Sequence, residues 1–190
     1  IYRKPEGVLT FAKKYPANDF YRSQTEFAFE KLARKSSTEA QSVFNDVMKA
    51  QKFPEKKQQE LADYVSFRLI NTDSDALAVW RDDVISTTSR QTLLERRARL
   101  AIQHADWSGL VKWVSKLDES HQASLRWQYW LGRAEVETGK VTQGKQRLMA
   151  STGQRNFYSV AAAKEIKQSI NYSTSTLKLE REKVAPFKET

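Results

Sequence analysis

Small and large apolar residues recur along the chain at a spacing typical of helix surfaces. In five stretches a small residue is followed four positions later by a large apolar one. Positions i and i+4 share one face of an α-helix, so each pair forms a notch beside a bulky side chain. The pairs are Gly7–Phe11, Ala40–Phe44, Ala76–Trp80, Gly109–Trp113 and Gly144–Leu148. Their large residues are 33, 36, 33 and 35 positions apart, which predicts a repeated helical unit of about 34 residues.

A partner helix is predicted ahead of three of these pairs. It carries a small residue, Ala28, Ala98 or Gly132, eleven or twelve positions upstream of the small residue of the pair. Residues suited to begin or end helices lie between these segments. We expect N-caps at Asp19, Ser37, Asp73, Ser89 and Asp106, a first-turn proline at Pro54 and a C-terminal glycine at Gly139.

The predicted fold is all-α, a right-handed α-superhelix (solenoid) of about five antiparallel helix pairs over residues 1–168. One pair cannot bury its own apolar face, so neighbouring pairs must stack. Gly7–Phe11 is interpreted as a second helix without its first, and residues 157–167 as a first helix without its second. We therefore expect a chain that is truncated at its N-terminus and cut from a longer protein. Residues 169–190 are predicted to form an extended arm or linker.

The segment LGRAEVETGKVTQGKQRL, residues 131–148, is the clearest single unit. Its glycines Gly132, Gly139 and Gly144 follow the tetratricopeptide pattern. The tyrosine that is usual in that pattern is replaced by Glu135. The other units match only through their small–large pair, so we predict degenerate tetratricopeptide-like repeats.

The composition indicates a helical protein but leaves its function open. Of the 190 residues, 39% are hydrophobic and 29% charged, with only 6 Gly and 4 Pro, which favours a helical protein. The absence of cysteine excludes disulfides, thiol catalysis and cysteine metal sites. A net charge of +9 favours a polyanionic partner without choosing among nucleic acid, anionic lipid and acidic cell-wall polymer. No apolar run approaches the roughly 18 residues of a membrane span.

Patterns for catalysis, metals and nucleotides are absent from the sequence, so we predict no cofactor and no metal. His104 and His121 lack the spacing of metal ligands. Asp82 and Asp83 are adjacent, so their carboxylates diverge around a helix. The basic segment ERRAR, residues 95–99, is interpreted either as a solvated face or as part of a positive inner surface. It is not interleaved with aromatic residues as in a single-strand groove, so no nucleic-acid partner is expected.

Three aromatic-rich blocks lie between residues 105 and 170. The first block is ADWSGLVKWVSKLDE, residues 105–119. The matching residues of the other two blocks are Arg126, Trp127, Tyr129, Trp130, Arg133, Gly139, Arg155, Phe157, Tyr158, Ala161, Ala162 and Ile166. In order and spacing these blocks resemble those of the soluble lytic murein transglycosylases. The resemblance implies a long α-superhelix that precedes a linker domain and a lysozyme-like catalytic domain.

The resemblance also implies the chemistry of the whole enzyme. It would cleave the β-1,4 bond between N-acetylmuramic acid and N-acetylglucosamine and leave a 1,6-anhydromuramic end. The catalytic glutamate of the family stands in a Glu-Ser pair ahead of a Gly-Leu-Met-Gln run. This chain contains Glu119-Ser120 without that run, so we interpret the pair as a turn or cap. We expect the catalytic domain to be missing, the chain alone to be no enzyme, and residues 169–190 to lead towards that domain.

The aromatic and basic residues of the second and third blocks are candidates for glycan binding. Indole and phenol rings can stack on the C–H faces of sugars, and arginines bind carboxylates. The competing interpretation is an inter-repeat core with arginines packed on its rings. The candidates are Arg126, Trp127, Tyr129, Trp130, Arg133 and Tyr158.

The function predicted from these observations is the non-catalytic superhelical scaffold region of a periplasmic soluble lytic murein transglycosylase. Its expected partners are peptidoglycan glycan strands and the catalytic domain of its own full-length protein, with no membrane span. An alternative from another class stays open. A tetratricopeptide-like adaptor would bind a segment of a partner protein in its groove.

Overall fold

The computed structural model describes residues 3–167, which form helices and no β-strand. The predicted arm, residues 169–190, lies outside the described residues, as does the predicted boundary at residue 168. The helices are η1 (Pro5–Gly7), α1 (Val8–Lys14), α2 (Asp19–Lys35), α3 (Ser37–Ala50), α4 (Glu55–Arg68), α5 (Asp75–Thr87), α6 (Gln91–Gln103), α7 (Trp107–Val114), α8 (Glu119–Gln122), α9 (Leu125–Glu137), α10 (Val141–Ala150) and α11 (Phe157–Glu165).

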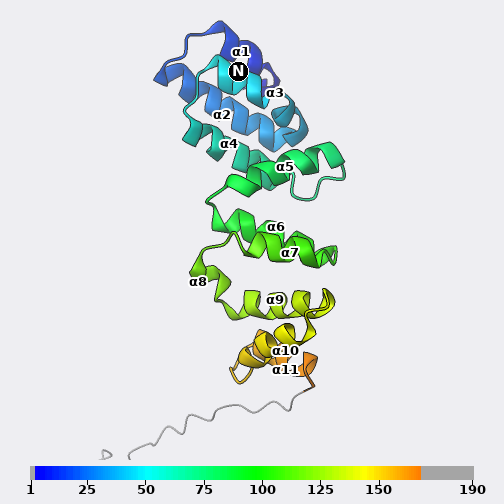
Figure 1. Cartoon of the computed structure of the whole chain (residues 1–190). Coiled ribbons are helices and arrows are strands. Elements are labelled where there is room, and N and C mark those ends of the chain that lie inside the picture. Colours follow the sequence, from blue (N-terminus) through cyan, green and yellow to red (C-terminus); the bar gives the residue numbers. More distant parts are fainter. Residues whose placement is uncertain (1–2, 168–190) are drawn as a thin grey trace, which may run out of the picture.

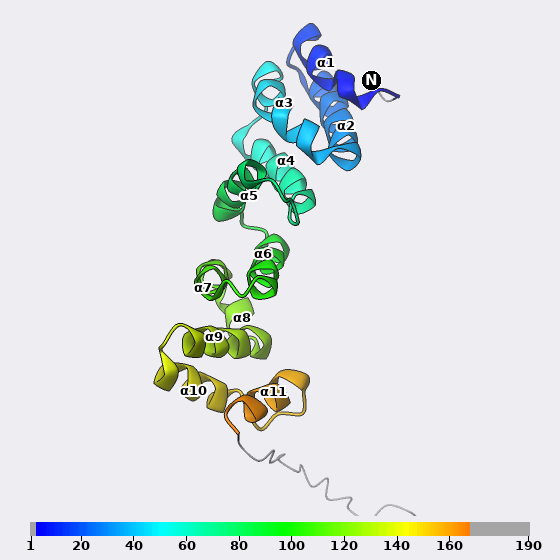
Figure 2. The ribbon, with the colours of Figure 1, turned by 90° about the vertical axis from the view of Figure 1, so that its right-hand side faces the viewer.

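The helices stack in chain order into an elongated molecule, with α1 at one end and α11 at the other (Figure 1). The pairs α2–α3, α4–α5, α6–α7 and α9–α10 lie side by side, and each pair packs on the next. The view turned by 90° shows the same order along a curved stack (Figure 2). The predicted all-α superhelix of helix pairs is therefore confirmed. Within residues 3–167, no helix is both long and apolar enough to cross a membrane.

Helix starts lie within one residue of the predicted caps. Asp106 caps α7 as predicted, because its Oδ1 accepts a hydrogen bond from the Gly109 backbone N–H at 2.8 Å. The other cap predictions are wrong by one residue. The N-cap positions are Asn18 rather than Asp19, Ser36 rather than Ser37, Ser74 rather than Asp73 and Arg90 rather than Ser89, and Pro54 is itself the N-cap of α4. Which of two adjacent residues caps a helix depends on the backbone angles, which composition does not reveal.

Three helices end in the same left-handed turn. Gly139 has φ of 87°, and the N–H of Lys140 donates to the Glu135 carbonyl at 2.8 Å. This confirms the C-terminal glycine of α9. The same turn occurs at Lys52 and Ala105, with φ of 50° and 51°, closed by hydrogen bonds of 3.1 and 2.9 Å. Neither of these residues signals a left-handed conformation in the sequence.

The close helix approach that small residues were expected to allow occurs in two pairs. Gly132 and Gly144 are buried between α9 and α10, and a Cβ atom on Gly144 would lie 2.6 Å from the Gly132 carbonyl oxygen. Ala28 and Ala40 are completely buried between α2 and α3. At Gly109 the space is filled by the capping carboxylate of its own helix, not by a neighbouring helix.

Two of the predicted notches are wrong. Gly7 precedes α1, and a Cβ atom there would meet nothing within 4 Å. Val8 and Ala12 are the buried residues of this helix. In α5, Ala76 is exposed and Ile85 is buried instead. Spacing alone therefore identified these two helices but not the faces that they bury.

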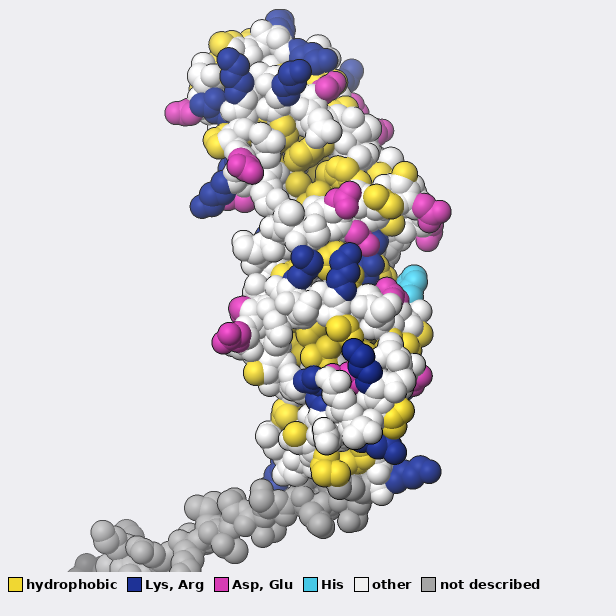
Figure 3. Space-filling model, viewed as in Figure 1, with side chains coloured by type: hydrophobic (Ala, Val, Ile, Leu, Met, Phe, Trp, Pro, Cys, Tyr) yellow, Lys and Arg dark blue, Asp and Glu magenta, His cyan; other side chains and the backbone are white. Residues whose placement is uncertain are grey.

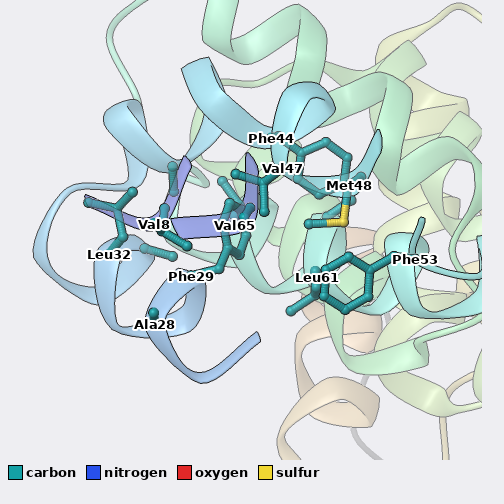
Figure 4. Packing of buried hydrophobic residues seen from close by; sticks show 14 of the residues in the cluster. Val8, Ala28, Phe29, Leu32, Phe44, Val47, Met48, Phe53, Leu61 and Val65 are labelled. Carbon is teal, nitrogen blue, oxygen red and sulfur yellow. The ribbon is translucent and has the colours of Figure 1, made fainter. Parts of the chain in front are cut away.

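The core follows the stack as three successive clusters of buried residues. Figure 4 shows the first cluster, in which Phe29 and Phe44 meet edge to face with ring centroids 5.9 Å apart. The second cluster contains Trp113 and Trp127. The third and smallest cluster, which includes Tyr129, lies where α9, α10 and α11 meet. Each repeat thus buries its apolar face against its neighbours.

Candidate binding site

Helix α9 carries five of the six residues predicted to bind glycan. It packs against α7, α10 and α11 near one end of the stack (Figure 1). Its buried positions include Trp127, Gly132 and Ala134. The structure divides the six candidates into core residues and residues that reach the surface.

Trp127 and Tyr129 belong to the core. Trp127 is fully buried, and its Nε1–H donates to Oε1 of Glu95 at 2.8 Å. Tyr129 is 6% exposed, and its ring centroid lies 5.9 Å from that of Tyr158. A buried indole presents no face to a sugar, so Trp127 offers no stacking surface in this structure. For these two residues the geometry matches the core interpretation.

Trp130 and Arg133 form a second group on α9. The Arg133 guanidinium lies 5.9 Å from the Trp130 ring centroid and 5.7 Å from that of Trp107. Carboxylate oxygens of Glu137 and Glu165 lie 3.6 and 3.5 Å from Arg133 nitrogens. Burial opposes the charge of Arg133, but the pKa of its guanidinium is raised because Glu165, Tyr129 and Glu137 together outweigh that cost. A ligand carboxylate at Arg133 would have to compete with these two acidic residues.

Arg126 and Tyr158 line a small cavity of about 330 Å³, here called the α8–α9 notch. Residues from four helices of the stack line this cavity. These are Glu95 of α6, Ser120 and His121 of α8, Ser124 and Arg126 at the start of α9, and Tyr158 of α11. The Arg126 guanidinium lies 5.9 Å from the Tyr158 ring centroid. The notch is the place where two of the predicted residues come together in one cavity.

Helix α8 is a capped turn, as the sequence predicted for Glu119-Ser120. Asp118 Oδ1 accepts hydrogen bonds from the His121 backbone N–H at 2.9 Å and from the Ser120 hydroxyl at 2.8 Å. The Nδ1 atom of His121 lies 2.7 Å from the same oxygen. These contacts stabilise the carboxylate and lower the pKa of Asp118 to about 2. Glu119 is exposed at the first position of this four-residue helix.

The basic segment of α6 does not present a uniform positive surface. Arg97 donates to both carboxylate oxygens of Asp82, at 2.8 and 3.0 Å. The Arg96 guanidinium lies 4.2 Å from the Phe67 ring centroid. Basic groups are instead spread along one whole face of the stack, between apolar patches (Figure 3). No sequence pattern indicated the Arg97–Asp82 pair, since its members are 15 positions apart on different helices.

A larger groove of about 600 Å³ lies between α5 and α6. Its principal cation, Arg81, is buried and donates to the Ile70 carbonyl at 2.7 Å and to Asp82 at 2.8 Å. The first bond satisfies a carbonyl just beyond the C-terminal end of α4 and the second is an ion pair, so the guanidinium has a structural role. Among residues 3–167, no group of three or more His, Asp or Glu side chains is placed to hold a metal ion.

The fold and the site together define a superhelical helix-repeat protein with a polar notch between its last repeats. No family model matches the chain. It is 36% identical over 163 residues to the soluble lytic murein transglycosylase of Salmonella typhimurium, and 36% identical over 167 residues to that of Escherichia coli strain K12. These matches cover 85% and 87% of this chain, and 25% and 26% of the relatives.

A solved structure gives the same result. The 70-kDa soluble lytic transglycosylase in complex with bulgecin A matches this chain with a TM-score of 0.79 and 34% identity. The match covers 89% of this chain and 28% of that one. The chain therefore belongs to the soluble lytic murein transglycosylase family, and it spans about a quarter of the length of the relatives that it matches.

Proposed function

We propose that this chain is the non-catalytic superhelical scaffold of a periplasmic soluble lytic murein transglycosylase. The observation that carries the proposal is the 36% identity over 85% of the chain. The whole protein would cleave the bond between N-acetylmuramic acid and N-acetylglucosamine in peptidoglycan and leave 1,6-anhydromuramic ends. The reaction would take place in a part of the protein other than these helix pairs.

The scaffold would guide peptidoglycan through charge and through the surface residues near α9. The net charge of +9 and the basic groups along one face attract the carboxylates of murein peptides. This attraction reaches only about 8–10 Å at ordinary ionic strength, so contact requires particular side chains. Arg126, Trp130, Arg133 and Tyr158 are the candidates for direct contact. Trp127 and Tyr129 would support them from the core.

The local environment of the carboxyl groups supports the non-catalytic part of the proposal. Glu119 is exposed on a short capped helix and is not enclosed in a cavity. Burial raises the pKa of Asp63, but its two oxygens accept hydrogen bonds from Gln59 and Thr88 at 2.8 and 2.7 Å. We therefore assign Asp63 to the link between α4 and the turn after α5.

The test is to incubate the full chain with purified peptidoglycan sacculi, sediment the sacculi, and analyse the soluble products. We expect binding that weakens as salt is raised and no release of anhydromuropeptides. Replacing both Arg126 and Arg133 with Gln should weaken binding by about a hundredfold or more if both make contact, since each charged contact contributes about 1.5–3 kcal/mol. The control replaces the exposed Arg99 and Arg155 with Gln and removes the same charge.

Three other outcomes of this experiment would contradict part of the proposal. Anhydromuropeptide release by the chain alone would contradict the non-catalytic role and direct attention to Glu119. A failure to sediment with sacculi would contradict the guiding role and leave the adaptor function as the better explanation. Equal weakening by the test and control variants would mean that binding depends on net charge rather than on α9.

A further inference from the structure

Two oppositely charged side chains line the α8–α9 notch without forming an ion pair with each other. Glu95 and Arg126 both face this cavity, yet no carboxylate–guanidinium distance within the 4.0 Å limit of an ion pair joins them. The Arg126 guanidinium packs near the Tyr158 ring. Glu95 accepts a hydrogen bond from the neutral Trp127 indole. Among residues 3–167, neither charge has an oppositely charged partner.

Two other charges on the flanking elements do have partners in the structure. Asp118 is held by His121 and by the Ser120 hydroxyl. On the other side of α9, Glu135 pairs with Arg147 at 2.7 Å. The notch contains a cation and an anion, a phenol ring, an imidazole and serine hydroxyls, all at the meeting point of α6, α8, α9 and α11.

This arrangement selects against most simple ligands. An anion at Arg126 would be repelled by Glu95, and a cation at Glu95 would be repelled by Arg126. A neutral ligand would cover both charges without pairing either one, which costs free energy. A ligand that carries both an ammonium and a carboxylate group on the same carbon pairs both charges at once.

We propose that the α8–α9 notch binds an α-amino-acid zwitterion, with its carboxylate on the Arg126 guanidinium and its ammonium group on the Glu95 carboxylate. A guanidinium binds a carboxylate through two parallel N–H bonds, which fixes the orientation of the ligand. The Tyr158 ring covers the hydrocarbon part of the ligand. A cavity of about 330 Å³ accommodates one amino-acid end rather than a length of polymer.

The source of this zwitterion follows from the proposed function and rests on it. Murein stem peptides that end in a diamino acid carry an ammonium and a carboxylate group on the same carbon. The notch would hold that end of the peptide while the sugars extend outside it. The chemistry of the notch does not depend on this source, so the two can be tested separately.

The Trp127 indole provides a reporter for the test, because its N–H bonds to the oxygen of Glu95 that lies beside the ligand. We would titrate the isotope-labelled chain with diaminopimelic acid and follow the indole N–H signals by NMR. We expect a saturable shift of the Trp127 signal. Full N-acetylation or full esterification of the probe should each weaken binding by about tenfold, the effect of one charged hydrogen bond.

Two variants test the contributions of the two charges separately. Glu95→Gln keeps an oxygen acceptor for the Trp127 indole but removes the charge, and Arg126→Gln removes the cation. Each should weaken binding of diaminopimelic acid by about tenfold. Arg99→Gln is the control, because Arg99 is exposed on the same helix as Glu95 and does not line the notch. Weakening by only one of the two notch variants, or by neither, would overturn the zwitterion site. Circular dichroism of each variant establishes that it is folded.

A parallel titration uses a disaccharide-tripeptide that ends in diaminopimelic acid. Binding of both probes, weakened by both variants, supports the site and its murein source. Binding of diaminopimelic acid alone supports the notch and removes murein as its source. If sacculi bind but neither probe shifts the Trp127 signal, the proposed function stands and the notch proposal falls. If sacculi and both probes all fail to bind, both proposals fall.

Discussion

The backbone of Gly144 in α10 lies directly against that of Gly132 in α9. A Cβ atom on Gly144 would be 2.6 Å from the Gly132 carbonyl oxygen and 2.9 Å from the Val136 backbone nitrogen. These obstacles are main-chain atoms, which cannot rotate away as a side chain can. The two helices of this pair therefore touch backbone to backbone, and the position admits only glycine without a shift of one helix.

Replacing Gly144 with Ala is expected to destabilise the chain by about 1–3 kcal/mol, the usual cost of overpacking. The loss should occur although Ala favours a helix over Gly by about 1 kcal/mol. Urea unfolding followed by circular dichroism measures the difference. Gly7→Ala is the matched control, because a Cβ there meets nothing within 4 Å and its φ is −77°. A Gly144→Ala chain as stable as the unmodified one would contradict the backbone contact.

Glu135 is expected to stabilise the same helix pair through Arg147. The carboxylate is 7% exposed and accepts from Nη2 and Nε of Arg147 at 2.7 and 3.0 Å. Hydrogen bonding to Glu135 raises the pKa of the Arg147 guanidinium. Glu135→Ala should cost about 2 kcal/mol, less than for a fully buried pair because Arg147 is partly exposed. A double-mutant cycle with Arg147→Ala should give a coupling of about 1 kcal/mol. Additive effects of the two single substitutions would show that the pair contributes no coupling energy.

The α9–α10 helix pair also shows which features the repeat pattern could predict. The pattern identified the helices, their pairing and the close contact at Gly132, because those features depend on residue size at a fixed helical spacing. It flagged Glu135 as the departure from the tetratricopeptide pattern. It did not indicate Arg147 as the partner, since the two residues belong to different helices and are 12 positions apart.

The predictions from sequence were wrong where the same residues are compatible with several local structures. Ala76 and Gly7 have the right spacing, but other residues of their helices are more apolar and take the buried face. Lys52 and Ala105 adopt the left-handed conformation of Gly139 without glycine. Their turns are held by hydrogen bonds to the preceding helix, and such bonds are visible only in the folded chain.

The candidate site was only partly predictable for a related reason. The family resemblance identified Arg126 and Tyr158 as members of aromatic-rich blocks. It gave no indication that Glu95 would lie in the same cavity, because Glu95 comes from another repeat. It also did not separate Trp127, which is buried, from Trp130, which is partly exposed. Three positions on a helix differ by about 60° around its axis, enough to turn one ring into the core and the other towards the surface.

Asp82 should make the junction between α5 and α6 sensitive to acid. It bridges two largely buried guanidiniums, those of Arg81 and Arg97, which are 5% and 11% exposed. Burial alone would raise the pKa of Asp82, but the hydrogen bonds from Arg97 and Arg81 outweigh burial and hold it below its ordinary value. A carboxyl whose folded pKa is lowered contributes stability above its unfolded pKa, about 3.9, and loses that contribution as pH falls through the folded pKa.

The free energy of unfolding should therefore fall more steeply below about pH 4 in the unmodified chain than in Asp82→Asn. At pH 7, Asp82→Asn should be less stable by about 2 kcal/mol, because two guanidiniums lose their charged partner. The difference between the two chains should narrow as the pH falls, since protonation removes the same charge from Asp82. Denaturant unfolding at intervals between pH 7 and pH 3 measures this difference in the free energy of unfolding. Asp83→Asn, an exposed neighbour on the same helix, should follow the unmodified chain. Parallel curves for Asp82→Asn and the unmodified chain would mean that the two arginines do not depend on the Asp82 charge.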